Sequence, residues 1–221
     1  MGRMAGTRAR TAPEADQREP RGPSWLFERR LWSGGLPLVA GVDEAGRGPL
    51  AGPVVAAAAA FHPGDFAAAL AGLNDSKRLS PLARARLAPR IRGAAAAWAV
   101  ACVAPAEIDA MGIGQASLEA MRRAVALLRP LPQHLLVDGP YLPRLHLAQT
   151  AVIGGDGLCG SIAAASVLAK VARDALMDGW DLVYPGYGFA VHRGYPTAAH
   201  RAALARLGPC PLHRRSFRLE P

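Results

Sequence analysis

Two adjacent carboxylates, Asp43 and Glu44, close the apolar run 36–42 and are followed at once by the turn Gly46–Gly48. Neighbouring ionised carboxylates repel each other, so a fold that buries both usually places cations between them. Glycines on both sides of Arg47 let main-chain N–H and C=O groups approach a ligand at distances that a Cβ would forbid. The segment therefore predicts a strand that leads into a metal site able to touch a nucleic-acid backbone. An ordinary strand end with a polar turn is the alternative.

Two further acids occupy comparable positions. Asp138 follows the short apolar run 135–137 and precedes a Gly-Pro turn, while Asp156 lies in the glycine-rich turn 154–157 before a long helical stretch. An α/β sheet brings together residues at the ends of its strands even when they are remote in sequence. Because the four oxygen donors come without an associated Cys or His spacing, they indicate hard cations, Mg²⁺ or Mn²⁺, rather than zinc.

Several longer stretches match the motifs of one known family, in that family's order. They are Asp43-Glu44-Ala45-Gly46-Arg47-Gly48, Asp75-Ser76-Lys77-Arg78-Leu79, Val137-Asp138-Gly139, Ser161–Ser166 with Lys170–Asp174, Tyr184–Phe189, His192–Tyr195 and His213–Phe217. From about residue 37 to residue 217 the chain resembles ribonuclease HII, the type 2 ribonuclease H of bacteria. It departs from many relatives at Gly154, where they carry lysine, and at Cys159, where they carry serine.

The resemblance implies an endoribonuclease that hydrolyses the RNA strand of RNA–DNA hybrids and cuts 5′ of single ribonucleotides embedded in duplex DNA. The products would be 3′-hydroxyl and 5′-phosphate ends, and the reaction would suit ribonucleotide removal during repair and replication of DNA. Two divalent ions, Mn²⁺ or Mg²⁺, are the implied cofactors. The residues expected to hold them and to be catalytic are Asp43, Glu44, Asp138 and Asp156.

Substrate contacts are expected from the glycine turn and from side chains elsewhere. Main-chain groups of the turn can read the 2′-hydroxyl, which separates RNA from DNA, and the family's tyrosine stacks on the deoxyribose that follows the ribonucleotide. The expected substrate-binding residues are Gly46, Arg47, Gly48, Lys77, Lys170, Arg173 and Tyr195. A solvated charged helix surface is the alternative for Lys170 and Arg173, and Lys170 can also pair with Asp174.

The net charge of +9 is concentrated at the two ends of the chain. Residues 1–30 carry seven arginines against four acids, and residues 184–221 carry six arginines against one acid. This distribution fits basic arms that grip phosphate around a central acidic pocket. Arginine supplies all but two of the 26 basic residues, so a bias in coding composition is an alternative origin of the charge.

The chain is organised as one domain after a basic leader. Residues 1–35 are predicted to be a disordered N-terminal segment, and residues 36–221 the catalytic domain, with a C-terminal helical extension from about residue 178. No signal peptide or membrane span is evident, and the three cysteines show no CxxC spacing, so we expect a cytoplasmic monomer. Its expected partners are RNA–DNA hybrids and DNA duplexes that contain ribonucleotides.

Hydrophobic patterning predicts an α/β fold, a ribonuclease H-like mixed β-sheet flanked by helices. Strands are expected near 37–43, 53–61, 96–103, 134–138 and 149–153, and helices near 80–92, 105–129 with a break at Gly112 and Gly114, 161–178 and 197–207. In a regular strand Asp43 and Glu44 would point to opposite faces. Both can then reach one metal cluster only if the strand ends or bulges between them.

Two other functional classes share some of these sequence features. A non-catalytic basic protein that binds nucleic acid would explain the arginines but not the four acids at segment ends. A type 3 ribonuclease H would share the carboxylates, yet it usually carries a folded N-terminal domain, for which about 35 residues are too few. A dinucleotide or P-loop site is excluded, because Gly46–Gly48 lacks the third glycine of G-x-G-x-x-G and no G-x-x-x-x-G-K-[ST] occurs.

Overall fold

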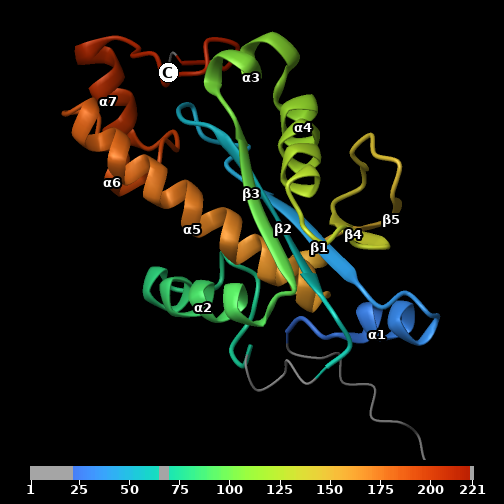
Figure 1. Cartoon of the computed structure of the whole chain (residues 1–221). Helices are drawn as coiled ribbons and strands as arrows, with labels where there is room; N and C mark the ends of the chain where they lie inside the picture. Colours follow the sequence, from blue (N-terminus) through green and yellow to red (C-terminus); the bar gives the residue numbers. More distant parts are fainter. Residues whose placement is uncertain (1–21, 65–69, 220–221) are drawn as a thin grey trace, which may run out of the picture.

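The computed structural model describes residues 22–64 and 70–219, which form a mixed five-stranded sheet flanked by helices (Figure 1). The strands are β1 (Val39–Ala45), β2 (Val54–Phe61), β3 (Ala97–Val103), β4 (His134–Asp138) and β5 (Ala148–Val152), in the spatial order β3-β2-β1-β4-β5. β1, β2 and β3 pair antiparallel, whereas β4 runs parallel to β1 and to β5. The predicted α/β fold class is confirmed.

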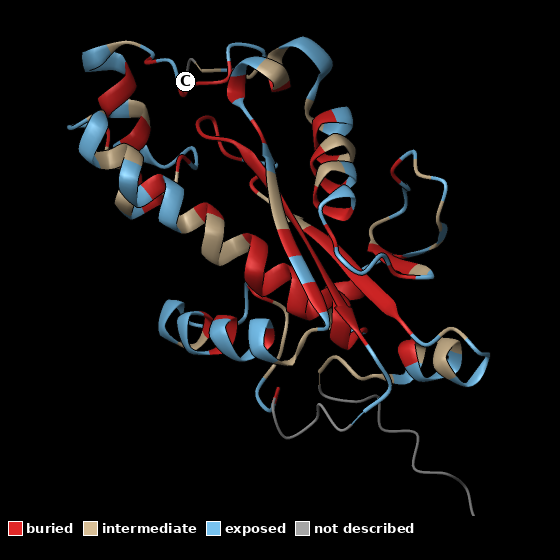
Figure 2. Cartoon of the chain, viewed as in Figure 1, coloured by how far each residue is buried: buried red, intermediate tan, exposed pale blue. Residues whose placement is uncertain are grey.

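Helices cover both faces of this sheet. They are α2 (Pro81–Ala94), α3 (Pro105–Met111), α4 (Ile113–Ala126) and the long α5 (Gly160–Val183). α4 packs against β2 and β3 on one face, and α5 packs against β1 and β2 on the other, with α2 beside it (Figure 1). Every residue of β2 is buried, and its run of alanines lets the two helices approach from both sides (Figure 2).

Glycine at one position sets how closely α5 approaches the sheet. A Cβ placed on Gly41 would lie 2.1 Å from the carbonyl carbon of Ser161, at the start of α5. Only glycine allows this backbone-to-backbone contact, so the N-terminus of α5 rests directly on the middle of β1. The contact fixes the helix close to the strand that carries the first two acids.

Most predicted elements occur, with shifted ends. The predicted break near Gly112 separates α3 from α4, and Gly112 itself has φ +78°. The helix predicted to end at residue 178 continues to Val183, so the C-terminal extension starts later than expected. This extension contains α6 (Phe189–His192) and α7 (Ala198–Leu207). α6 and the short 3₁₀ turn η1 (Gly155–Gly157) were not predicted.

The predicted N-terminal boundary at residue 36 is wrong for the part of the leader that the structure describes. Residues 1–21 lie outside the described residues, but residues 26–33 form helix α1 (Leu26–Ser33). Its Glu28 is fully buried and accepts hydrogen bonds from the main-chain N–H and the hydroxyl of Ser161, at 2.8 and 2.5 Å. Trp25 packs against Gly160 and Phe61. α1 therefore belongs to the folded domain, attached to the N-terminus of α5.

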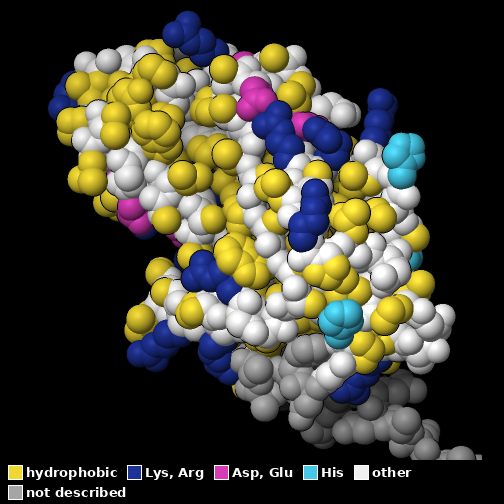
Figure 3. All heavy atoms as spheres, in the orientation of Figure 1, with side chains coloured by type: hydrophobic (Ala, Val, Ile, Leu, Met, Phe, Trp, Pro, Cys, Tyr) yellow, Lys and Arg dark blue, Asp and Glu magenta, His cyan; other side chains and the backbone are white. Residues whose placement is uncertain are grey.

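On one face of the molecule, the basic side chains are spread out (Figure 3). On the face shown in Figure 3, Lys and Arg side chains lie above several elements and do not gather into a single patch. This face therefore shows no continuous basic arm. Among the described residues, no helix combines the length and apolar character needed to cross a membrane.

Candidate active site

The ends of β1 and β4 bring three of the four acids together. The parallel pairing of these strands ends at Val42 and Val137, so Asp43 and Asp138 are the next residues on neighbouring strands. Asp43, Glu44 and Asp138 line one cavity of about 330 Å³. Asp156 lies in η1, beside them, where the main-chain N–H of Gly155 donates to Asp138 Oδ1 at 2.6 Å. η1 thus orients one acid while it carries another.

Asp43 and Glu44 reach the same cavity without the strand end or bulge that we predicted between them. β1 continues to Ala45 in regular antiparallel register with β2. β4, however, pairs with β1 only as far as Val42, so the other edge of β1 is open at the two acids. The two side chains leave opposite faces of the strand and meet around this open edge. The early end of the neighbouring strand, rather than a bulge, brings them together.

Burial and like charge act together on these acids. Asp43 is only 4% exposed, and burial first, then the charges of Glu44 and Asp138, raise its pKa well above the usual aspartate value. Hydrogen bonds from Ser166 and from the main chain of Glu44 oppose that rise. Burial also raises the pKa of Glu44, against the effect of Arg47, and the pKa of Asp156, against the effect of Lys77. The edge of the sheet thus concentrates negative charge that its surroundings do not fully compensate.

An all-oxygen donor set with uncompensated charge suits hard divalent cations. In the described ranges 22–64 and 70–219, no three His, Cys, Asp or Glu side chains are close enough to one another to be ready ligands of a single ion. The acids therefore converge as mutually repelling groups, and a bound cation would draw them closer. Two basic side chains already compensate part of the charge: Lys77 lies 3.4 Å from Asp156, and Arg47 lies 3.5 Å from Glu44.

The glycine turn and the predicted basic contacts lie around the same cavity, with one exception. Gly46, Arg47, Gly48, Lys77, Lys170 and Tyr195 all line it. Lys170 Nζ donates to Asp174 at 2.6 Å, as the spacing of four residues predicted. Tyr195 is 43% exposed and stands beside Gly48.

Arg173 is the exception, and the structure contradicts its predicted phosphate contact. It is 1% exposed, and its Nε and Nη2 donate to the carbonyls of Pro53 and Ala51 at 3.0 and 3.1 Å. Gly46, at φ +98°, lies directly over it, so that an added Cβ would come 2.1 Å from Arg173 Nε. Arg173 supports the glycine turn from below and does not face the cavity.

Arg214 supports the same turn and was given no role from the sequence. It is fully buried, and its guanidinium donates to the carbonyls of Gly46, Arg47 and Gly52 at 2.6, 2.8 and 2.9 Å. A planar guanidinium with several donors is well suited to bind three carbonyls at once. Its place in the motif His213–Phe217 was the only signal available, and that motif does not reveal which arginine is buried.

A chain of neutral histidines holds the backbone of Tyr195. His200 Nδ1 lies 2.9 Å from the Tyr195 carbonyl, so it must donate, which leaves its Nε2 as an acceptor. His213 Nε2, 3.1 Å away, must then donate to His200, and His213 Nδ1 accepts from the main-chain N–H of Cys210. Burial lowers the pKa of both histidines, to about 4 for His200.

Cys159, where many relatives carry serine, is buried. Burial raises the pKa of its thiol to about 12, so that thiol is protonated at neutral pH.

Comparison with known proteins gives consistent relatives. The family model described as Ribonuclease HII matches residues 40–220. A Ribonuclease HII of Moorella thermoacetica is 54% identical over 204 residues, which cover 92% of this chain and 98% of that protein. One from Pelotomaculum thermopropionicum is 56% identical over 195 residues, 88% of this chain and 73% of that protein.

Solved structures show the same arrangement of elements. The ribonuclease H2 of Pyrococcus horikoshii OT3 superposes with a TM-score of 0.71 at 28% identity, covering 82% of this chain and 94% of that one. RNase HII from a PCNA:RNase HII complex of Archaeoglobus fulgidus gives 0.69 at 28% identity, with coverage of 83% and 96%. Bst-RNase HIII in complex with Mn²⁺, at 21% identity and a TM-score of 0.66 over 93% of this chain and 74% of that one, shares the fold.

Proposed function

The chain belongs to the ribonuclease HII family, and from this membership we propose that it cuts duplex DNA on the 5′ side of an embedded ribonucleotide, as well as the RNA strand of RNA–DNA hybrids. Ribonuclease H activity follows from the family; the single-ribonucleotide substrate is the proposal. The observation that supports it is the pairing, in one cavity, of the acidic edge with an exposed tyrosine and a glycine turn. The acidic edge suits phosphodiester hydrolysis, and the tyrosine and the glycine turn suit recognition of a sugar.

We assign metal binding to Asp43, Glu44, Asp138 and Asp156. The donor set is all oxygen, and the raised pKa of Asp43 reflects its burial first and then the negative charge of neighbouring carboxylates, which cations would relieve. These four carboxylates would hold two divalent ions, whose chemistry there would be activation of a water and stabilisation of the departing oxygen. The Mn²⁺ complex of the fold relative Bst-RNase HIII supports Mn²⁺ as a candidate, and the oxygen donors of this site suit Mg²⁺ as well. Gly155 keeps Asp138 oriented toward this role through its N–H group.

The glycine turn is positioned to read the sugar. Arg214 already engages the carbonyls of Gly46 and Arg47, so we assign the 2′-hydroxyl mainly to the N–H groups of the turn Gly46–Gly48. Tyr195, held through its carbonyl by His200, would stack on the deoxyribose that follows the ribonucleotide. A sugar bearing the hydroxyl, followed by one without it, would then satisfy both contacts.

Lys77 and Lys170 would bind phosphates of the cleaved strand. The side chain of Lys77 is 78% exposed and only loosely paired with Asp156, so it can turn toward a phosphate. Once cations neutralise the acids, that ion pair becomes weaker and the lysine is released for substrate. Lys170 lies at the other side of the same cavity, where Asp174 limits its motion.

The test is cleavage by the full chain of three duplexes of one sequence: one with a single ribonucleotide, one RNA–DNA hybrid and one all-DNA. We expect cleavage of the first two with Mg²⁺ or Mn²⁺, no cleavage with EDTA, and a 3′-hydroxyl end immediately 5′ of the single ribonucleotide. Cleavage of the hybrid alone would overturn the single-ribonucleotide substrate. Metal-independent binding without any cleavage would instead favour the non-catalytic alternative.

A further inference from the structure

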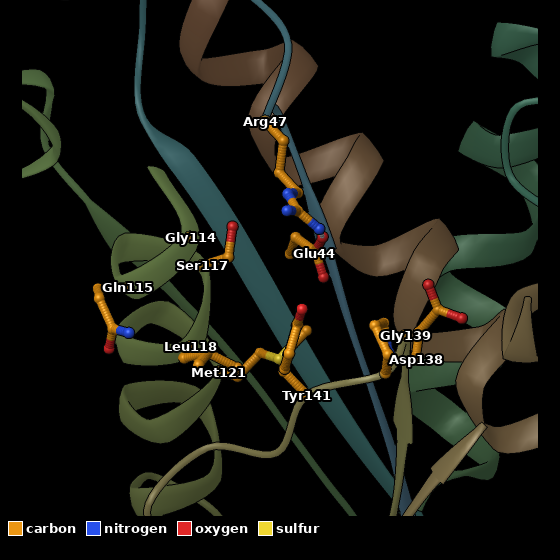
Figure 4. A pocket seen from close by; sticks show the side chains of 11 residues that line it. Glu44, Arg47, Gly114, Gln115, Ser117, Leu118, Met121, Asp138, Gly139 and Tyr141 are labelled. Atoms are coloured by element: carbon orange, nitrogen blue, oxygen red, sulfur yellow. Dashed lines mark hydrogen bonds and ion pairs between the residues drawn. The ribbon is translucent and has the colours of Figure 1, made fainter. Parts of the chain in front are cut away.

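A second pocket opens beside the acids, on the face of the sheet that α4 covers. It has a volume of about 190 Å³ and shares Glu44, Arg47 and Asp138 with the candidate active site. Its other wall is formed by α4 and by the segment after β4, through Gln115, Ser117, Leu118, Met121 and Tyr141 (Figure 4). Tyr195 lies outside this pocket. The acids therefore separate two spaces, one with Tyr195 and one with Tyr141.

The hydroxyl of Ser117, in the wall of this pocket, has no hydrogen-bond partner among the described residues. The residue is 4% exposed. Serines inside helices commonly bond the carbonyl four residues earlier, but this one does not. Figure 4 shows Ser117 on the side of α4 that faces Glu44, and its oxygen is almost fully enclosed. A buried hydroxyl left unpaired is unfavourable, and a rotation of this side chain toward a ligand in the pocket would relieve the cost.

The remaining lining fits a sugar. Leu118 and Met121 give an apolar floor, and Tyr141, which is 70% exposed, offers an aromatic ring across from them. Sugar rings combine apolar faces with oxygen atoms at their edges, which matches an aromatic surface next to a hydroxyl and the amide of Gln115. A volume of about 190 Å³ suits a single sugar ring better than a whole nucleotide.

A wider depression continues from this pocket. It has a volume of about 650 Å³, shares Gln115, Leu118 and Tyr141 with the pocket, and ends at Arg122 and Arg144. Arg122 is held by Glu119 at 2.7 Å, whereas Arg144 is exposed at the rim. A polynucleotide that leaves a sugar in the pocket would place its next phosphates near Arg144. The acids, the pocket and Arg144 therefore follow one another along one surface.

On the basis of the proposed function, we propose that this pocket binds the deoxyribose of a nucleotide on the 5′ side of the scissile phosphate. Tyr195 is assigned to the nucleotide after the ribonucleotide, and the pocket lies across the acids from Tyr195. A strand that passes over the acids therefore leaves the cavity through the pocket in the 5′ direction. Tyr141 supplies the stacking surface, Ser117 and Gln115 bind sugar oxygens, and Arg144 binds a phosphate farther along.

The experiment compares arm lengths. Duplexes with one ribonucleotide carry either a long or a two-nucleotide 5′ arm on the cleaved strand, and in a second pair either a long or a two-nucleotide 3′ arm. With wild-type protein we expect shortening of either arm to reduce kcat/KM at least tenfold. Tyr141→Ala should lose about tenfold or more on the long substrate, as loss of a stacking partner does, and lose little more when the 5′ arm is shortened. It should keep its full dependence on the 3′ arm.

Matched variants identify the cause. Tyr141→Phe keeps the ring and should restore the dependence on the 5′ arm, and Ser117→Ala should weaken that dependence severalfold. Leu182→Ala removes an exposed apolar side chain at the far end of α5 and should behave as wild type. Tyr195→Ala should show the reciprocal pattern and lose its dependence on the 3′ arm. Thermal unfolding of each variant confirms that the fold is retained.

Two outcomes would overturn this assignment. One is an unchanged dependence of Tyr141→Ala on the 5′ arm, and the other is a loss that falls on the 3′ arm. Binding of the same duplexes, measured by fluorescence anisotropy in EDTA, separates this result from failure of the proposed function. If the protein binds these duplexes with a preference for the long 5′ arm that depends on Tyr141, but cleaves none of them, the pocket assignment would stand. The proposed cleavage at single ribonucleotides would then be overturned.

Discussion

The acidic edge of the sheet and the C-terminal segment both bury charge and polar groups, but they do so in opposite ways. Asp43 is buried among other carboxylates, and the like charges of Glu44 and Asp138 raise its pKa further. Arg214 is buried with three carbonyls bound to its guanidinium. Charge that the fold leaves uncompensated indicates a place where something from outside binds. Charge that the fold satisfies indicates a part that holds the structure together.

The two regions meet at the glycine turn, which explains why they occur together. The turn follows the acids directly. Arg214 donates to the carbonyls of Gly46 and Arg47 in the turn, and Arg173 donates to the carbonyl of Ala51 just after it. His213 forms an isolated β-bridge with Ala51, farther along the same loop. Residues 213–214 therefore hold the loop 46–53, which borders the acids, in place. Catalytic charge and structural charge should respond differently to substitution, and the following experiments separate them.

The largest effect is expected at the acids. Asp43→Asn or Asp138→Asn should lower kcat/KM by at least a thousandfold, because a neutral amide replaces a carboxylate that binds metal. Unfolding of the metal-free protein should not become easier, since each change removes a charge that repels the neighbouring acids. The measurement pairs cleavage kinetics with thermal unfolding, and the exposed Asp178→Asn is the control. Turnover within tenfold of wild type for either variant would refute the metal assignment.

A smaller but structural effect is expected at Arg214. Arg214→Met keeps much of the volume but leaves three carbonyls without their donor, which should cost about 3 kcal/mol or more of unfolding free energy. Arg215→Met, at the exposed neighbouring arginine, should cost less than 0.5 kcal/mol, in the usual range for surface substitutions. Denaturant unfolding measures both. Equal unfolding free energies of the two variants would show that Arg214 does not stabilise the fold through the three carbonyls.

The two regions should also respond to pH with opposite signs. The pKa of His200 is lowered to about 4, so between pH 6.5 and 4 the unfolded chain binds a proton that the folded chain does not. Stability from His200 is therefore present above pH 6.5 and is lost as pH falls. The loss at pH 5 should be roughly 2 kcal/mol. Asp43, whose pKa is raised, contributes the other way: in metal-free protein its contribution declines as pH rises through the raised value.

Variants can assign this pH dependence. His200→Gln should flatten the part of the stability profile between pH 6.5 and 5, whereas His62→Gln, at an exposed histidine, should leave it unchanged. Urea unfolding of metal-free protein at several pH values is the measurement. If the profile of His200→Gln matched wild type, the histidine chain would not be the group that titrates.

The acids were predictable because their signal is local. Asp43 and Glu44 adjoin an apolar run and a glycine turn, and Asp138 ends another run, so strand-end geometry follows from short windows of sequence. Arg173 was not predictable in the same way. It lies three residues from Lys170 on one helix, and only the packing of the loop 46–53 decides that the lysine faces the cavity and the arginine does not.

Helix α1 was missed for a related reason. It is short, it has no side-chain cap, and its anchoring carboxylate pairs with Ser161, 133 residues away. No local pattern reports such a contact. Arg214 and the histidine chain are likewise defined by partners on other elements, so tertiary contacts override what the local sequence indicates.

The smallest effect is expected at the N-terminus, where the boundary between dispensable and structural residues is sharp. Residues 1–21 show no apolar face in the sequence, so their removal should change the melting temperature by less than about 2 °C and leave metal-dependent cleavage in place. Extending the deletion through α1 should be much more costly, since Ser24 bonds the main chain at Leu158 and Gly160, and Glu28 bonds Ser161. Glu28→Ala in the full chain isolates the last contact, because it leaves the N–H group at the start of α5 without its acceptor. Circular dichroism melting of the three proteins would order them. A large drop in melting temperature on removal of residues 1–21 alone would show that these residues contribute to the fold. A negligible drop on removal of α1 would show that the contact between Glu28 and Ser161 does not stabilise the domain.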